Sequence, residues 1–488
     1  MKGLDDPGHM TPASLAGFAR RIDETLVEIP ASARADMKVP ARFFADDVLW
    51  AQIVSDRSIE QLTNVATLPG VSKAVYSMPD THEGYGFPVG GVAAFRTLDG
   101  VISPGGVGYD INCGVRLLAS TLSVNDLGPT LEALVHELSR SIPAGAGRSS
   151  RYGMSDAELD RVFVDGCRFL EERGMATTED LEHTEAGGCL PGANPKAVSK
   201  RARDRGRDQL GTMGSGNHFV EVQRVEQIFD QPSAKVLDLR EGQIVVLIHS
   251  GSRGLGHQVC TDSVRELDGV MPNYGIDLPD RQLACAPFDS EAGRKYFGAM
   301  CSAANYAWCN RQVITHVTRE AFARILGPDT KLRLIYDVAH NIAKVEEYGG
   351  ERLCVHRKGA TRAFGPANPE TPAAYRTVGQ PVFIPGSMGT ASYVLVGRDT
   401  ALERSFGSAC HGAGRRMSRR RAARLKHGRE VRDELAARGI VVRCPSLREL
   451  AEEAPHAYKD VDHVVDIVER AGLAGRVARL IPLGVIKG

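Results

Sequence analysis

Short apolar runs that end at glycine-rich loops recur along this chain. Residues 242–250 (GQIVVLIHS) and 392–397 (SYVLVG) are continuously apolar, which predicts buried strands. Residues 331–341 (KLRLIYDVAHN) alternate between apolar and polar positions and predict a further strand. Two of these runs end at a histidine, His249 in the first and His340 in the last. The pattern therefore predicts imidazoles held rigidly at strand ends.

Other segments have the spacing of helices. Residues 129–142 and 461–473 repeat apolar positions every three or four residues, and each predicts an amphipathic helix. Residues 417–439 predict one long, strongly charged helix that ends at a glycine. The basic residues within 415–432 could simply form a solvated helix face. Strands and helices are intermixed without a repeat or a long linker, which predicts a continuous α/β unit.

Glycine is the compositional outlier, with 52 residues gathered in clusters. Glycine lets backbone N–H groups approach a ligand closely. Each cluster also carries a histidine, cysteine, aspartate or hydroxyl residue beside a strand-like run. We therefore expect one composite site built from distant segments. The clusters occupy residues 84–91, 104–114, 210–219, 249–257, 384–390 and 406–414.

Charge and hydropathy exclude several classes of protein. The 60 basic and 60 acidic residues cancel, so any nucleic acid would have to bind a local patch rather than a polycation. No apolar run approaches the roughly 18–20 residues of a membrane span. The first ten residues lack the apolar segment of a secretory signal. We accordingly expect a cytoplasmic protein whose ten cysteines are mostly reduced thiols.

Five residues in the glycine clusters and at the strand ends have metal-ligating chemistry. Asp110 and Cys113 stand three residues apart in GYDINCG, and His218, His249 and His340 stand beside apolar runs. Carboxylate, thiolate and imidazole together suit Mn, Fe, Co or Zn better than Mg or Ca. Each residue alone has a structural alternative, such as a capping aspartate, a small buried cysteine or a core histidine. Their joint occurrence favours a metal site.

Three further segments suggest phosphate binding. His411 stands in SACHGAGRRMSR, where it could act as a general base, a metal ligand or a nucleophile that forms a phosphoramidate. Residues 384–395 (IPGSMGTASYVL) offer backbone N–H and hydroxyl donors, although a plain turn would explain them too. Residues 355–364 (VHRKGATRAF) place cations around Gly359 rather than at helical spacing, which favours a polyphosphate or nucleic-acid backbone.

Taken together, these motifs resemble the RtcB family of RNA-splicing ligases. The resemblance runs in order from about residue 48 to residue 488 and also includes DTHEGYGFPVGGVAAF, AYKDVDHVV and IPLGVIKG. It implies a single large α/β domain over residues 41–488, with mixed, largely antiparallel sheets, surrounding helices and glycine-rich active-site loops. Residues 1–40 have no assigned role, and residues 150–207 receive no chemical one.

The resemblance implies GTP-dependent joining of RNA ends. A 2′,3′-cyclic phosphate or 3′-phosphate would be sealed to a 5′-hydroxyl with two Mn²⁺ ions, in tRNA splicing or RNA repair. His411 corresponds to the histidine that becomes guanylylated. Asp110 and Cys113 correspond to metal ligands, with Cys113 bridging. His218 would hold one ion, and His249 and His340 would hold the other.

The resemblance also assigns binding residues. Tyr458 would stack on guanine, Glu221 would accept hydrogen bonds from guanine, and Lys487 matches a penultimate lysine. The implied GTP or GMP contacts are Asn217, Glu221, Asn341, Pro385, Gly386, Ser387, Met388, Ser392, Gly412, Ala413, Gly414, Tyr458 and Lys487. The candidate RNA contacts are Arg357, Lys358, Arg362, Arg415 and Arg419.

Partners and rival functions remain open at this level. The RNA could be tRNA halves or other broken ends, and the helper protein archease could assist in some hosts. One rival is a nucleotidyltransferase that caps 3′-phosphate ends without ligation. Another is a non-catalytic protein that binds metal and RNA.

Overall fold

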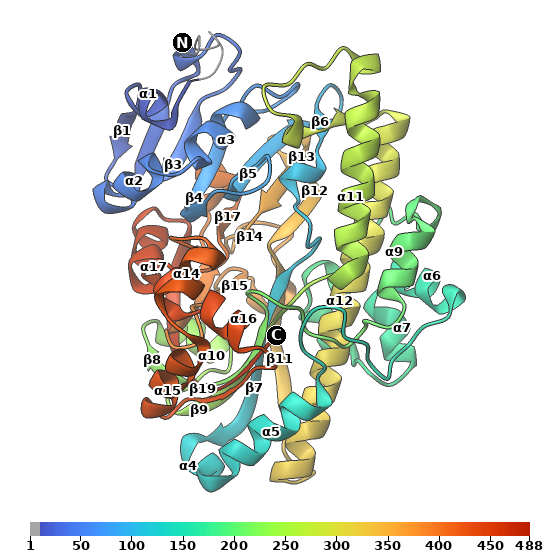
Figure 1. Cartoon of the computed structure of the whole chain (residues 1–488), viewed down its shortest axis with the longest axis vertical. Helices are drawn as coiled ribbons and strands as arrows, with labels where there is room; N and C mark the ends of the chain where they lie inside the picture. Colours follow the sequence, from blue (N-terminus) through green and yellow to red (C-terminus); the bar gives the residue numbers. More distant parts are fainter. Residues whose placement is uncertain (1–9) are drawn as a thin grey trace.

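Two large sheets form the centre of the computed structural model, which describes residues 10–488 (Figure 1). The seven-stranded sheet has the order β1 (Arg20–Asp23), β2 (Leu26–Ile29), β3 (Ala41–Phe44), β4 (Val75–His82), β5 (Val89–Arg96), β13 (Glu351–Lys358), β12 (Asn341–Tyr348). The second has the order β11 (Leu332–Ala339), β7 (Gly114–Ser123), β9 (Gln243–Ser250), β8 (Phe219–Ile228), β19 (Ala474–Lys487), β16 (Ser392–Gly397), β15 (Pro381–Ile384), with β18 (Val441–Arg443) paired to β19. Most pairs are antiparallel; β3–β4 and β18–β19 are parallel.

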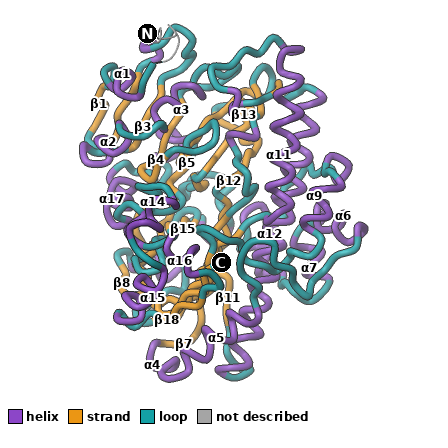
Figure 2. The backbone as a smooth tube through the Cα atoms, in the orientation of Figure 1, coloured by secondary structure: helices purple, strands orange, loops and turns teal. Residues whose placement is uncertain are grey.

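Many helices surround the strands (Figure 2), and two short ribbons complete the fold. The ribbons are β6 (Val101–Ile102) with β10 (Ala286–Pro287), and β14 (Ala360–Arg362) with β17 (Ser408–Cys410). Helices α11 (Arg253–Val270) and α12 (Glu291–Leu326) run side by side along one flank. The remaining α-helices are α1 (Pro12–Ala16), α2 (Asp47–Val54), α3 (Ser58–Val65), α4 (Val124–Leu127), α5 (Leu131–Ser141), α6 (Asp156–Asp165), α7 (Cys167–Glu172), α8 (Thr178–Glu182), α9 (Lys200–Gly206), α10 (Gln231–Val236), α13 (Thr400–Ser405), α14 (Arg419–Leu425), α15 (Gly428–Ala437), α16 (Leu447–Glu452) and α17 (Val461–Arg470).

The predicted mixed α/β fold with largely antiparallel sheets is confirmed. The apolar run at 242–250 forms β9, where all eight residues are buried, so both faces of the strand are covered. The strands predicted at 331–341 and 392–397 are β11 and β16. The segments 461–473 and 129–142 contain α17 and α5 as expected, the latter preceded by a short 3₁₀ turn.

The single charged helix predicted for 417–439 is wrong, because the segment forms α14 and α15 with a break between them. Lys426 is extended, and the backbone N–H of His427 donates to Glu430 Oε2 at 2.8 Å to begin α15. Gly428 lies so close to the backbone of α16 that a Cβ would meet the Leu447 carbonyl oxygen. The break therefore allows the two helices to pack separately against α16.

A buried charge network ties α12 to the second sheet. The Asp337 carboxylate on β11 accepts hydrogen bonds from Arg116 on β7 and from Arg311 on α12, and all three side chains are fully buried. Arg311 also donates to the carbonyl oxygens of Asn112 and Ser250, at 2.7 and 2.9 Å. Arg311 therefore holds the backbone just before β7 begins and at the last residue of β9.

Both segments without an assigned role are folded parts of the chain. The strands β1 and β2 extend the seven-stranded sheet at its edge, while residues 1–9 lie outside the described part. Residues 150–207 form α6 to α9, which pack against α11 and α12. All ten cysteines are free thiols, as expected. Within residues 10–488, none of the helices has the length and apolar character to cross a membrane.

Candidate active site and metal centre

A cavity of about 240 Å³ opens where the strand ends of both sheets meet. All six glycine clusters contribute residues to its wall, as the sequence pattern predicts. Its lining residues are His82, Val89, Gly108, Tyr109, Asp110, Cys113, Asn217, Phe219, His249, His340, Asn341, Lys358, Gly359, Pro385, Gly386, Ser387, Met388, His411, Gly412, Ala413, Gly414, Arg415, Arg419, Glu453, Tyr458 and Lys487.

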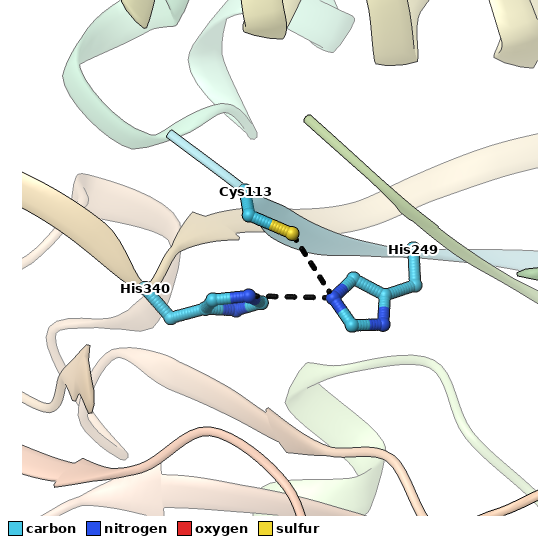
Figure 3. A group of neighbouring side chains, drawn as sticks. All are labelled: Cys113, His249 and His340. Carbon is cyan, nitrogen blue, oxygen red and sulfur yellow. Dashed lines mark hydrogen bonds between the residues drawn. The ribbon is translucent and has the colours of Figure 1, made fainter. Parts of the chain in front are cut away.

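Cys113 stands at the centre of two groups of potential metal ligands. Its Sγ lies 3.3 Å from Nε2 of His249, which lies 3.3 Å from Nε2 of His340 (Figure 3). On the other side, Sγ lies 3.2 Å from Nε2 of His218, which lies 2.8 Å from Oδ2 of Asp110. The ligand atoms within each group of three lie within 4.8 Å of one another. One thiol is thus shared between two candidate sites.

The protonation states of these groups fit a divalent transition metal. Burial lowers the pKa of His249 and of His340 well below the usual histidine value, so both imidazoles are neutral and have a free lone pair. Burial works to raise the pKa of Asp110, but His218 outweighs it and the pKa falls, leaving a carboxylate. Burial raises the pKa of the Cys113 thiol, which a bound cation would reverse. The donor set of nitrogen, sulfur and oxygen suits Mn, Fe, Co or Zn.

His411 lies beside this cluster, and Asp80 orients it. The rings of His411 and His340 are 4.7 Å apart between centroids. Oδ2 of Asp80 lies 2.6 Å from Nδ1 of His411 and accepts its backbone N–H at 3.2 Å. With its proton on Nδ1, next to this carboxylate, the imidazole keeps a free lone pair on Nε2. The arrangement is that of an oriented nucleophile or base.

A buried lysine supports the strand that carries Asp80. Lys459 Nζ donates to the carbonyl oxygens of Pro79 and Thr81, at 3.1 and 2.6 Å, on either side of that residue. Burial lowers the pKa of Lys459 to about 8. The sequence pattern assigns no role to Asp80 or Lys459, although Asp80 begins the motif DTHEGYG.

Glu453 organises the wall on the C-terminal side of the cavity. This buried carboxylate accepts hydrogen bonds from Arg415 at 3.0 Å, from Arg419 at 2.8 Å and from the Tyr458 hydroxyl. The Arg415 guanidinium also lies over the Tyr458 ring, 5.1 Å from its centroid. Burial lowers the pKa of the neighbouring Lys487. The wall combines a fixed aromatic face with cations, which suits a nucleotide. Sequence reasoning gave Glu453 no role.

Two of the expected nucleotide contacts, Glu221 and Ser392, are buried next to the residues that line the cavity rather than among them. Gln223 Nε2 donates to Glu221 Oε2 at 2.6 Å and to Ser392 Oγ at 3.1 Å. Ser392 Oγ in turn accepts the backbone N–H of Gly386, at 3.2 Å, in the cavity wall. The other expected contacts line the cavity directly. His218, too, reaches the cavity only through its contacts with Asp110 and Cys113.

The structure brings three of the five candidate RNA contacts to the cavity and leaves two elsewhere. Arg357 is fully buried on β13 and pairs with Glu346 at 2.6 and 2.9 Å. Arg362 is buried on β14 and pairs with Glu370 at 2.9 Å. Their cations are paired with carboxylates inside the fold, and neither residue lines the cavity. The remaining candidates, Lys358, Arg415 and Arg419, line it.

Comparison with known proteins gives consistent matches. Residues 61–488 match the protein family described as tRNA-splicing ligase RtcB. The tRNA-splicing ligase RtcB of Archaeoglobus fulgidus is 54% identical over 482 residues, covering 97% of this chain and all of the relative. That of Thermococcus kodakarensis is 52% identical over 476 residues, covering 96% of this chain and 98% of the relative. The RNA-splicing ligase RtcB of Mycobacterium tuberculosis is 52% identical over 435 residues, covering 88% of this chain and all of the relative.

Proposed function

The chain belongs to the RtcB family of tRNA-splicing ligases, and we propose that it joins RNA ends in a GTP-dependent reaction. The substrates would be a strand that ends in a 2′,3′-cyclic phosphate or 3′-phosphate and a strand that begins with a 5′-hydroxyl. The observation that carries the proposal is His411, oriented by Asp80 and placed beside a cluster of metal ligands in a cavity with a nucleotide-like wall.

In the proposed first step, Nε2 of His411 attacks the α-phosphorus of GTP. A P–N bond forms while the P–O bond to pyrophosphate breaks, and pyrophosphate leaves with the electron pair. The imidazole becomes positively charged, and the Asp80 carboxylate stabilises this charge through its contact with Nδ1. The cations at Arg415, Arg419 and Lys358 would offset the charge on the phosphates.

The next steps transfer the GMP group from His411 to the RNA 3′-phosphate and then join the two strands. A cyclic phosphate is first opened by water to a 3′-phosphate. An oxygen of the RNA 3′-phosphate then attacks the phosphorus on His411, so the P–N bond breaks and the imidazole is regenerated. The 5′-hydroxyl attacks the activated 3′-phosphate and loses its proton to water. A new P–O bond forms while the P–O bond to GMP breaks, and GMP leaves with the electron pair. The cavity holds both ends together and replaces a bimolecular encounter with a positioned one.

Two Mn²⁺ ions would be held by Asp110, Cys113 and His218 on one side and by Cys113, His249 and His340 on the other. When bound, they supply positive charge to the reacting phosphates.

Replacing Cys113 by alanine removes the shared ligand, so we expect binding of both Mn²⁺ ions to weaken by at least about 10-fold. Titration with Mn²⁺ under calorimetric detection measures this effect. The half-buried Cys189, outside the cavity, provides the matched Cys189→Ala control. Unchanged Mn²⁺ binding by Cys113→Ala would contradict the assignment.

Glu221 is proposed to select guanine, and its environment makes this selection depend on pH. Its Oε1 atom is buried without a hydrogen-bond partner, and burial raises its pKa to about 8. We propose that guanine N1–H and N2–H both donate to the ionised carboxylate of Glu221, so GTP binding should release a proton below pH 8. We expect the Kd for GTP to fall roughly tenfold per pH unit between pH 6 and 7 and to level off above 8. Calorimetry at several pH values measures this slope. Glu221→Gln should lose both the slope and the preference for GTP over ATP; a wild-type Kd independent of pH would refute the role.

A sealing assay tests the proposed function directly. Purified protein, GTP and Mn²⁺ are incubated with one labelled strand that ends in a 3′-phosphate and one strand that begins with a 5′-hydroxyl. We expect a longer product that resists phosphatase, and no product when GTP is omitted or when the acceptor carries a 5′-phosphate. Accumulation of capped 3′-ends with no joined product would favour the nucleotidyltransferase rival. RNA binding without either product would favour a binding protein. Adding archease to an inactive sample tests the need for that helper.

A further inference from the structure

A row of three aromatic side chains lies at the metal side of the cavity and has no part in the proposed reaction. The rings of Tyr85 and Tyr109 meet edge to face, with centroids 5.4 Å apart and planes at 66°. The ring of His257, on α11, lies 6.1 Å from Tyr109 at 33°. Tyr109 lines the cavity and directly precedes the metal-ligand candidate Asp110. Both tyrosines are half-buried and His257 is exposed, so each residue keeps some surface accessible to a ligand.

The loop that carries Tyr85 is held from several directions. Gln61 exchanges two hydrogen bonds with the backbone of Gly84, at 2.7 and 3.0 Å. Gln282 accepts the backbone N–H of Gly86 at 2.9 Å. Lys358 Nζ donates to the carbonyl oxygens of Tyr85 and Phe87, at 2.5 and 2.9 Å. The backbone that carries the half-exposed Tyr85 is therefore preorganised, which lowers the entropy cost of binding a flat ligand.

Tyr109 is fixed by its own loop. Gly108 before it has a φ of +93°, a conformation that side chains rarely adopt and that sets the turn. After it, the carbonyl oxygen of Asp110 accepts a hydrogen bond from Asn341 Nδ2 at 3.1 Å. Tyr109 therefore stands at a defined place beside the metal cluster, whereas Tyr458 belongs to the wall organised by Glu453.

The chemistry of the row suits a nucleobase better than a phosphate. Its members present ring faces and hydroxyls. Asp280 lies close enough to Tyr85 to contribute, after burial and Tyr109, to raising its pKa to about 12. The arginines of the cavity pair with Glu453 beside Tyr458, and Lys358 donates to the carbonyl oxygens of Tyr85 and Phe87. Aromatic side chains bind single-stranded RNA by stacking on its bases with little dependence on sequence.

We propose that Tyr85, Tyr109 and His257 form a stacking surface for the terminal nucleobase of one RNA strand. The base would stack on Tyr109 while the terminal phosphate or hydroxyl of that nucleotide reaches the metal cluster next to Asp110. Tyr109 is then a substrate-positioning residue at a second nucleobase site, separate from the guanine site at Tyr458. This inference rests on the proposed ligase function.

Abasic RNA ends test the stacking surface. Sealing is measured as kcat/KM for an intact pair of strands, for a pair whose 3′-phosphate strand ends in an abasic nucleotide, and for a pair whose 5′-hydroxyl strand begins with one. We expect wild type to prefer the intact pair over one of the two abasic pairs by roughly 5- to 100-fold, the range that stacking of one base contributes. The abasic strand that loses activity identifies the bound end.

Variants of Tyr109 test whether its ring causes the preference for the intact pair over the abasic pair. Tyr109→Leu should reduce the ratio of intact to abasic kcat/KM to about one, mainly through KM. Tyr109→Phe should restore it, because the ring face remains. Tyr274→Leu, an exposed tyrosine outside the cavity, should keep the wild-type ratio. Two results would overturn the stacking surface and leave the ligase function standing. In the first, wild type seals all three pairs with equal kcat/KM. In the second, Tyr109→Leu keeps the wild-type ratio of intact to abasic kcat/KM. Failure of wild type to seal any pair would overturn both.

Discussion

Replacing His411 by alanine is expected to abolish the transfer of radiolabel from [α-³²P]GTP to the protein. The imidazole is the only nucleophile that the proposed mechanism provides, so its loss removes the covalent step rather than slowing it. We expect labelling and RNA sealing to fall by at least about 10³-fold. The measurement is a denaturing gel after incubation with GTP and Mn²⁺. The label on wild type should survive denaturation and be released by acid, as a phosphoramidate is.

Asp80→Ala separates orientation from nucleophilicity. The imidazole remains in this variant, but Nδ1 loses the carboxylate 2.6 Å away that fixes the tautomer. We expect slow labelling that is intermediate between wild type and His411→Ala. A His411→Ala protein that still becomes labelled would place the nucleophile elsewhere and refute the mechanism.

Replacing Asp337 by alanine is expected to cause the largest loss of stability. The variant leaves Arg116 and Arg311 fully buried without their shared carboxylate. Breaking a buried ion pair from one side costs about 3–5 kcal/mol of unfolding free energy, because the remaining charge stays desolvated. Urea unfolding followed by circular dichroism measures the change. Asp433→Ala, at an exposed carboxylate near Arg432, is the matched control and should stay within about 0.5 kcal/mol of wild type.

Asp337→Ala should also disturb the metal centre. Arg311 holds the carbonyl oxygens of Asn112 and Ser250, which neighbour Cys113 and His249 along the chain. Lower Mn²⁺ affinity in folded Asp337→Ala would support this coupling. A stability equal to that of wild type would show that the network contributes little.

Local patterns in the sequence predict the strands well, because a buried strand consists mostly of apolar residues and is therefore visible in the hydropathy pattern. The strand at 242–250 is apolar throughout because both faces of β9 are covered, and it places His249 at the cavity. The glycine clusters predicted a composite site because close backbone approach requires glycine at several strand ends. The family resemblance implies the two ligand groups around Cys113, and the ligand atoms of each group lie within 4.8 Å of one another.

Pairings between distant residues could not be predicted in the same way. Asp80 and His411 are 331 positions apart, and a single carboxylate carries no sequence signature of its partner. The cations next to Arg357 in the sequence predict an RNA contact there, yet Glu346 on the adjacent strand pairs with this guanidinium. The break at Lys426 was missed because the contact of Gly428 with α16 is tertiary.

The position of β19 has a consequence for synthesis. This strand lies between β8 and β16 in the second sheet, although both of them precede it along the chain. While a ribosome has yet to add residues 474–487, these partners present unpaired edges, which invite association between nascent chains. We therefore expect chains that terminate before residue 474 to aggregate rather than to persist as partly active fragments.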